Sequence, residues 1–233
     1  MSISDQLTDW LRSQGAAWVG FADLGEVSEG SRHGLPVGVS IALALDPVIV
    51  AQIENGPTRD YEDEYRRVNA QLNSLAASAV SLLEAADCSA VPIASTTHSI
   101  DYNTYSTLLP HKTIATRAGF GWIGKCALLV TESFGSAVRL VSVLTDASLP
   151  TALPIHIFRC GDCVACVEVC PGQAPSGKHW QVEIPRDTFF NASGCFTAAT
   201  EAATSKAGVM HPLCGMCIAV CPWTKRYIER AQP

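Results

Sequence analysis

Apolar positions in the first 86 residues recur at helical spacing and at strand spacing in turn. Residues 3–14 place Ile, Leu, Trp and Leu on one face, which predicts a short amphipathic helix that ends at Gly15. Residues 17–24 and 37–45 are mostly apolar and predict two strands. Residues 59–86 contain no Gly or Pro and carry apolar residues at helical spacing, so we expect one long helix packed on a sheet.

Shorter elements follow the long helix. Residues 89–94 predict a further strand, and residues 110–118 predict a short helix with a proline near its first turn. Residues 127–131 and 137–144 predict two strands that pair through a turn around Gly135. The fold class that we predict is α+β.

The texture of the sequence changes near residue 152. Pro150 and Pro154 interrupt the chain, and beyond them short segments rich in Gly, Pro and Cys replace the long apolar runs. We therefore expect two domains, residues 1–152 and residues 153–233.

Composition and charge restrict the class of protein. Hydrophobic residues make up 48% of the chain and charged residues 16%, so a substantial core is expected and general disorder is excluded. The net charge of −6 argues against a surface built mainly to bind phosphate backbones. No apolar run approaches the roughly 20 residues that a membrane span needs, and the first residues lack a secretory signal pattern. We expect a cytoplasmic protein without membrane contact.

Cysteines are concentrated towards the end of the chain. Eight of the ten fall after residue 155, and without an export signal a disulfide framework is improbable. Clustered cysteines in a reducing compartment more often bind metal. The other two, Cys88 and Cys126, are typical of small buried hydrophobic residues rather than of ligands.

The clustered cysteines form two runs. The first is C-x-x-C-x-x-C-x-x-x-C-P, which starts at Cys160 and is typical of bacterial ferredoxins, where three thiolates bind one 4Fe-4S cluster and the fourth reaches the other. The second run, C-x-x-C-x-x-x-C-P, starts at Cys214. Three cysteines of the first run recur in the second after a constant offset of 51 residues, which identifies an internal repeat.

The repeat leaves one ligand of the second cluster open. The residue equivalent to Cys160 is His211, so either His211 or a cysteine from elsewhere, with Cys195 the nearest, completes the set. Thiolates are the usual ligands of 4Fe-4S clusters, which favours Cys195. Structural zinc is the alternative, but it leaves the third cysteine and the repeated Cys-Pro ending unexplained. The predicted ligands are Cys160, Cys163, Cys166 and Cys221 for the first cluster and Cys170, Cys195, Cys214 and Cys217 for the second.

A glycine-rich block precedes the cysteines. Residues 119–124 match the dinucleotide fingerprint G-x-G-x-x-G, but that fingerprint needs a strand before it and a helix after it. Here the order is reversed, with a predicted helix before and a predicted strand behind. The glycines are better explained by a helix end and by close approach of the backbone to a flat ligand or a neighbouring strand.

Four segments together carry a resemblance to a known family: HKTIATRAGFGWIGK at residues 111–125, LLV at 128–130, GS at 135–136 and LTD at 144–146. They resemble the epoxyqueuosine reductases and their shorter paralogues, which also have an isolated cysteine upstream of the second run, in support of Cys195. The resemblance implies a cobalamin-binding α/β domain akin to the nitroreductase fold, followed by a ferredoxin-like domain with two 4Fe-4S clusters. Reductive dehalogenases are similar in layout.

The same resemblance implies which residues hold the cofactor. The implied contacts are His111, Lys112, Gly119, Gly121, Trp122, Gly124 and Lys125. The two lysines would meet polar groups of the corrin, and the tryptophan would stack on it. The alternatives are a solvated basic face for the lysines and packing in the core for the tryptophan.

The proton donor departs from the family pattern. The family has an Asp at a fixed separation before A-G-x-G-W, and the same separation in this chain reaches Tyr105. Asp101 is the nearest acid, and Tyr102 lies beside it. Tyr105, Asp101 and Tyr102 are therefore the candidate catalytic residues, with a packing role as the alternative for the tyrosines.

These observations predict an iron–sulfur reductase that acts on a small substrate through cobalamin. Its electrons would come from a donor such as ferredoxin or flavodoxin. Full epoxyqueuosine reductases carry a further segment that helps to hold tRNA, and this chain stops soon after its last cysteine, so tRNA is a doubtful substrate. A non-catalytic electron-transfer protein and a flavin-dependent iron–sulfur reductase are the rival interpretations.

Overall fold

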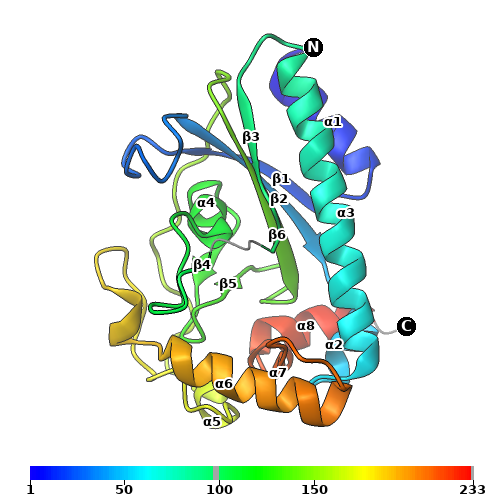
Figure 1. Cartoon of the computed structure of the whole chain (residues 1–233), viewed down its shortest axis with the longest axis vertical. Coiled ribbons are helices and arrows are strands. Elements are labelled where there is room, and N and C mark those ends of the chain that lie inside the picture. The colour runs from blue at the N-terminus through cyan, green and yellow to red at the C-terminus, as the bar shows by residue number, and fades with distance from the viewer. Residues whose placement is uncertain (97–99, 232–233) are drawn as a thin grey trace.

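A four-stranded antiparallel sheet forms the centre of the first part of the chain (Figure 1). The computed structural model describes residues 1–96 and 100–231. The sheet contains, in spatial order, β1 (Trp18–Asp23), β2 (Val37–Ala44), β6 (Val138–Thr145) and β3 (Ala90–Ile93). Each neighbouring pair is antiparallel.

Two helices cover one face of the sheet. They are α1 (Ile3–Ser13) and the long α3 (Arg59–Glu84), and the short α2 (Pro47–Ala51), which follows β2 in the chain, contacts α3. Ser2 caps α1 with its side chain, and Thr58 caps α3 in the same way, which explains where both helices begin. Their apolar faces join the inward residues of the strands in one core.

The other face carries α4 (His111–Arg117), which Figure 1 shows on the opposite side of the sheet from α3. The glycine-rich block follows α4 and contains β4 (Trp122–Ile123), which pairs with β5 (Leu129–Val130) as a separate two-stranded ribbon. Fully buried Ile114 anchors α4 in a second core on this face.

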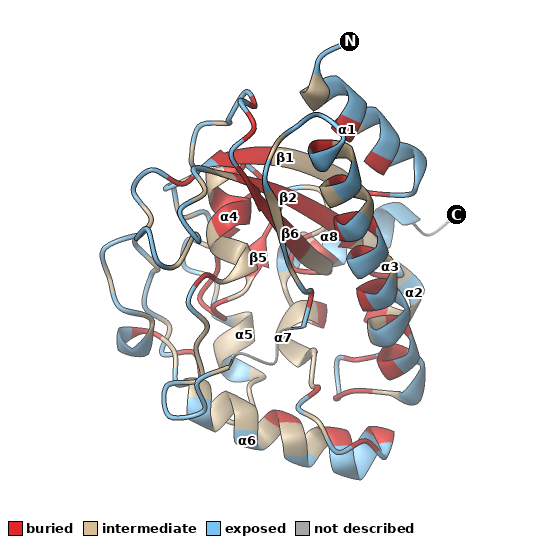
Figure 2. Ribbon diagram, turned by 45° about the horizontal axis from the view of Figure 1, so that its top comes forward, coloured by how far each residue is buried: buried red, intermediate tan, exposed pale blue. Residues whose placement is uncertain are grey.

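The segment after residue 152 consists of short helices and loops. The elements are α5 (Ala165–Glu168), a 3₁₀ turn (Arg186–Thr188), α6 (Ala192–Ala202) with a π-helical end (Ala203–Ala207), α7 (Met216–Ala219) and α8 (Pro222–Ala231). Figure 2 shows that buried residues gather in the sheet and on the inner sides of its helices, whereas α5 and α7 are only half-buried. The 51-residue repeat is visible here, because both ends of α5 have their equivalents in α7.

The end of the chain returns to the sheet layer. In α8 the Tyr227 hydroxyl donates a hydrogen bond to the Leu45 carbonyl at 2.8 Å, and the Ser136 amide donates to the Thr224 hydroxyl at 3.1 Å. Leu213 also joins the core beneath α3. The two parts therefore share apolar packing, and a domain boundary near residue 152 stays a prediction.

Most of the expected elements are confirmed, and one expectation is wrong. The strands expected at residues 127–131 and 137–144 do not pair with each other: β5 pairs with β4, and β6 enters the main sheet between β2 and β3. Thr131 and Gly135 instead close a tight loop that redirects the chain between the two sheets. No helix within residues 1–96 and 100–231 is long and apolar enough to cross a membrane.

Candidate iron–sulfur site and adjoining cavities

Five of the eight clustered cysteines line one cavity of about 230 Å³ at the start of α8. They are Cys160, Cys163, Cys166, Cys217 and Cys221. Cys126 from the first part of the chain is buried, as expected, but it also lines the same cavity, which the sequence did not predict. Within the described residues all ten cysteines carry free thiols.

The repeated backbone explains how the cysteines are held. In the first run the Cys170 amide donates to the Val167 carbonyl at 3.4 Å, and in the second the Cys221 amide donates to the equivalent Ile218 carbonyl at 3.3 Å. Each run therefore turns through one short helix and ends at a cysteine followed by proline. The same local sequence produces the same local geometry twice.

Cys170, Cys195 and Cys214 form a second group near α6. Burial raises the pKa of Cys195 to about 11, and the neighbouring thiols of Cys170 and Cys214 add to this shift. Gly172 makes the approach possible, because a side chain there would overlap the carbonyl of Gly194 in the first turn of α6.

His211, the alternative fourth ligand, points to a different partner. Its Nε2 lies 2.9 Å from Oε2 of Glu62, a carboxylate in the first turn of α3 that is 1% exposed. Arg66 pairs with the other oxygen of the same carboxylate. The structure thus brings Cys195 next to Cys170 and Cys214, whereas His211 lies beside Glu62.

The donor set suits iron–sulfur clusters. Among the described residues no three His, Cys, Asp or Glu side chains are arranged around a single ion. A 4Fe-4S cluster takes one thiolate on each iron and so needs its four cysteines spread around a larger object. Burial raises the pKa of Cys160, Cys214 and Cys221, so loading the site would release protons from these thiols.

The glycine-rich block supports the cysteine cavity. Gly121 allows the chain to pass close to β5, because a side chain there would overlap the Val130 carbonyl. Trp122 is 1% exposed, and its ring N–H lies 3.5 Å from the Cys160 sulfur. Gly124 lines the cavity directly, while Gly119 ends α4 with a φ of +77°.

Lys125 differs from its expected position. Its side chain is buried and Nζ donates hydrogen bonds to the carbonyls of Gly161 and Cys163, both at 3.0 Å. It therefore fastens the first cysteine loop to the sheet layer. Lys125 and Trp122 lie on the cysteine side of the block, away from the residues that line the two cavities described next.

Two further cavities, of about 470 and 280 Å³, meet at Thr107, Pro110 and Lys112. The larger is mostly apolar and lies between α4 and the segment around the 3₁₀ turn. The smaller lies between the start of α4 and the sheet and reaches Tyr61 on α3. Together they form an elongated hollow along the first turn of α4.

His111 and Lys112 are both fixed in this hollow. Burial lowers the pKa of His111, so the neutral ring donates from Nε2 to the Ala94 carbonyl and accepts at Nδ1 from the Ser142 hydroxyl, both at 2.9 Å. Burial, reinforced by Arg186, lowers the pKa of Lys112 to about 8. Its ammonium group donates to the Ala127 carbonyl at 2.7 Å.

The three candidate catalytic residues occupy one loop at the edge of the larger cavity. Tyr105 lines the cavity and has a φ of +51°, a strained conformation for a tyrosine. Tyr102 is 62% exposed. Asp101 accepts hydrogen bonds from the Asn103 amide and the Thr104 hydroxyl, and these bonds lower its pKa, so it stays ionised.

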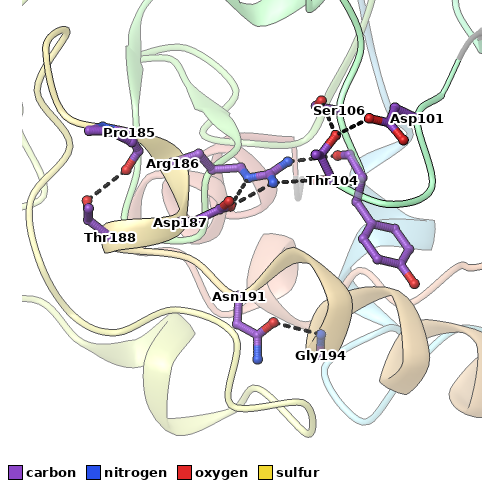
Figure 3. Close-up of polar contacts among 10 residues, drawn as sticks. Asp101, Thr104, Ser106, Pro185, Arg186, Asp187, Thr188, Asn191 and Gly194 are labelled. Carbon is purple, nitrogen blue, oxygen red and sulfur yellow. Dashed lines mark hydrogen bonds and ion pairs between the residues drawn. The ribbon is translucent and has the colours of Figure 1, made fainter.

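Arg186 is a residue of this site that the sequence did not reveal. Its guanidinium donates to the carbonyls of Thr104 and Tyr105, the latter at 2.7 Å, and also lines the larger cavity (Figure 3). Figure 3 shows that this contact joins the 3₁₀ turn to the loop at residues 101–106. A residue 81 positions later in the chain therefore holds the strained backbone of Tyr105 by a hydrogen bond.

Comparison with known proteins agrees with this geometry. Residues 159–224 match a family described as a 4Fe-4S double cluster binding domain. An epoxyqueuosine reductase of Atelocyanobacterium thalassa is 35% identical over 122 residues, which cover 51% of this chain and 39% of the relative. One from Synechocystis is 32% identical over 124 residues, or 52% and 42% of the two chains. The chain is similar to epoxyqueuosine reductases. It spans about two fifths of the length of these two relatives.

Solved structures show the same fold. Epoxyqueuosine reductase from Streptococcus thermophilus superposes with a TM-score of 0.59 at 18% identity, over 97% of this chain and 67% of that one. A reductive dehalogenase, whose structure is described in terms of B12-dependent dehalogenation, gives 0.69 at 15% identity over 94% and 33% of the two chains. The mixed helix and strand fold is thus shared with both groups.

Proposed function

We propose that this chain is an iron–sulfur oxidoreductase that holds two 4Fe-4S clusters on eight cysteines. The double cluster match over residues 159–224 carries this proposal, and the repeated backbone of α5 and α7 supports it. The first cluster takes Cys160, Cys163, Cys166 and Cys221, and the second takes Cys170, Cys195, Cys214 and Cys217. The cluster-binding unit is residues 153–233.

The two cysteine groups differ in their surroundings, which suggests a direction for electrons. The first group opens towards Arg159 and Arg226, both of which are exposed. The second lies nearer the paired cavities, since Phe196 beside Cys195 packs on Tyr105 with ring centres 5.0 Å apart. Electrons from a ferredoxin or flavodoxin would therefore enter at the first cluster and leave from the second.

We further propose that the paired cavities hold cobalamin. A corrin is broad and flat, and its rim carries amide groups, so it suits an elongated hollow that is apolar on its walls and polar at its centre. Lys112 and Thr107 are placed to bind those amides. When bound, the cofactor supplies a metal centre that accepts electrons and reduces an organic substrate.

Tyr105 is the proton donor in this proposal. It lines the larger cavity, and Arg186 fixes its backbone at 2.7 Å. A tyrosine hydroxyl carries one proton that it can donate to a substrate anion. The ionised Asp101 has no proton to give, and its carboxylate is used within its own turn. The exposed Tyr102 packs edge-on against Tyr105 and shields it.

The substrate in this proposal is a small molecule. One solved epoxyqueuosine reductase is bound to a modified tRNA stem loop. Here the net charge of −6 and the largely apolar lining of the cavity favour a small uncharged substrate over a nucleic acid. We place the protein in the cytoplasm, where reduced electron carriers are available and cysteines stay reduced.

Anaerobic purification followed by reconstitution tests this function. Preparations should contain about eight irons and eight sulfides per chain, since each cluster contributes four of both. Added cobalamin should bind with the spectrum of its base-off form, and Lys112→Met should weaken that binding while iron content stays unchanged. Zinc in place of iron would overturn the proposal.

Two other results would overturn only the cobalamin part of the proposal. A yellow chromophore extracted from the protein would identify flavin as the cofactor. Failure to bind either cofactor, together with rapid electron exchange with a partner protein, would identify a non-catalytic electron carrier. Both outcomes leave the cluster assignment intact.

A further inference from the structure

Cys126 is a ninth cysteine at the metal site. It is 5% exposed, and its thiol lies against the thiols of Cys166 and Cys217, where all three line the same cavity. The structure therefore places a thiol with no role in the eight-ligand assignment in contact with two of its members.

The two cysteines that Cys126 touches occupy equivalent positions in the internal repeat. Cys166 and Cys217 are separated by the 51-residue offset of the internal repeat, and each lies in the short helix of its own run. In the proposed assignment Cys166 belongs to the first cluster and Cys217 to the second. In that assignment Cys126 therefore touches one ligand of each cluster, and both of these ligands line the cavity that holds the other cysteines of the first cluster.

Its position is fixed from several directions. The Ala127 amide donates to the Gly124 carbonyl, and the Gly124 amide donates to the Leu128 carbonyl, both at 2.9 Å, which closes a tight turn around Cys126. A side chain at Gly124 would lie 3.5 Å from the Cys126 sulfur. Next to it Lys125 is anchored to the first cysteine loop. A thiol held in this way has little freedom apart from rotation of its S–H bond.

We propose that Cys126 is a positioning residue that couples the two clusters. Its single S–H donates a hydrogen bond to the sulfur of either Cys166 or Cys217, and it turns towards whichever cluster holds the extra electron. The inference rests on the proposed two-cluster assignment. No covalent bond forms or breaks: the electron that leaves one cluster arrives at the other, and the proton stays on Cys126.

The hydrogen-bonding capacity of the thiol explains how Cys126 could couple the two clusters. A thiol has one proton to donate, and here it faces two equivalent acceptors. Hydrogen bonds to cluster sulfurs help to set the reduction potential, because they stabilise the more negative, reduced state. The first cluster to be reduced therefore gains the bond, and the second is reduced without it. Cys126 should widen the gap between the two midpoint potentials.

Redox titration followed by electron paramagnetic resonance tests this role in the anaerobically purified, iron-loaded full chain. Cys126→Ala removes the donor, and Cys126→Ser keeps one in nearly the same volume. Cys88→Ala is the matched control, since Cys88 lies outside the cavity and its thiol donates to the Ala86 carbonyl at 3.4 Å. Iron content is measured on every sample before titration.

The expected result has three parts. All variants keep about eight irons. Cys126→Ala lowers the higher of the two midpoint potentials and narrows the gap between them. Cys126→Ser restores most of the gap, and Cys88→Ala leaves both midpoints where they are in the unmodified protein.

Other outcomes overturn the inference in recognisable ways. A loss of about half of the iron in both Cys126 variants would make Cys126 a ligand instead. Unchanged midpoints in a fully loaded Cys126→Ala protein would leave it a packing residue. Absence of iron from the unmodified protein would instead refute the proposed function, which separates the two failures.

Discussion

The sheet layer and the cysteine-rich segment are stabilised in different ways. Within the described residues the largest fully buried side chains, such as Leu72 and Ile41, all come from the first 145 positions. The cysteine-rich segment offers mainly small buried residues, and its helices α5 and α7 have four residues each. Helices of that length are not stable by themselves. The sheet can fold through burial of apolar surface, whereas under the proposed function we expect the segment around the cysteines to depend on metal binding and on contacts with the sheet.

The two regions share apolar packing in both cores and are also joined by specific hydrogen bonds. Lys125 reaches across to the first cysteine loop, and Arg186 reaches back to the loop that carries Tyr105. These long side chains tie each region to a backbone segment of the other. This difference predicts that loss of a cluster ligand destabilises only the segment after residue 152. A cavity in the sheet core should instead destabilise both regions.

Replacement of a cluster ligand should have the largest effect. Cys163→Ala should remove about half of the iron and should make the segment after residue 152 sensitive to protease, because that segment loses its main stabilising contact. Iron analysis and limited proteolysis measure the two effects. Cys88→Ala is the control, and an unchanged iron content would contradict the ligand assignment.

A cavity in the sheet core should lower stability less than the loss of a cluster does, but it should destabilise the whole chain. Ile41 in β2 is fully buried, and Ile41→Ala should lower the free energy of unfolding by about 2–5 kcal/mol. Urea unfolding of the iron-loaded and the iron-free protein measures it. The same loss is expected in both forms, and a loss confined to the loaded form would show that the sheet depends on the metal.

Loss of the Lys125 anchor should have an intermediate effect. Lys125→Met removes two hydrogen bonds from a charged group but also removes the burial of that charge, so we expect a net loss of about 1–3 kcal/mol. The loss should show as faster release of iron to a chelator, with hydrogen exchange in β2 and β6 unchanged. Equal effects on both regions would mean that the anchor supports the sheet as well.

The last effect is confined to alkaline pH. The pKa of Lys112 is lowered by burial, and then by Arg186, to about 8, against an ordinary 10.5 in the unfolded chain. The unfolded chain therefore binds more protons between these values, and the free energy of unfolding should rise from pH 8 to pH 10.5. Below pH 8 the cost of the buried charge is fully present. Lys112→Met should flatten this rise in urea titrations, and an identical slope in both proteins would exclude Lys112 as its source.

Local sequence patterns predicted the helices and strands whose formation depends mainly on neighbouring residues. α3 follows from a long stretch without Gly or Pro, and β1 and β2 follow from apolar runs. The repeat between the cysteine runs predicted the equivalence of α5 and α7, because short-range hydrogen bonds determine both turns. These parts of the structure need no information from distant residues.

Contacts between residues far apart in the chain determined the features that the sequence did not predict. β4 and β5 have two residues each, too few for a recognisable period, and their pairing depends on the close approach at Gly121. Trp122 and Lys125 carry the expected residue types, but their direction is set by the cysteine loop that follows later in the chain. Arg186 has no local signal, since its partners lie about 80 positions earlier.

The connection between α8 and the sheet has a consequence for biosynthesis. Cys221, which completes the first ligand set in the proposed assignment, directly precedes α8, and α8 docks on Leu45 through Tyr227. The sulfur donors therefore cannot all be assembled until the ribosome has made nearly all of this sequence. In the proposed assignment the first cluster can be completed only after Cys221 has been added to the chain, and until then the ligands made earlier must be kept as free thiols.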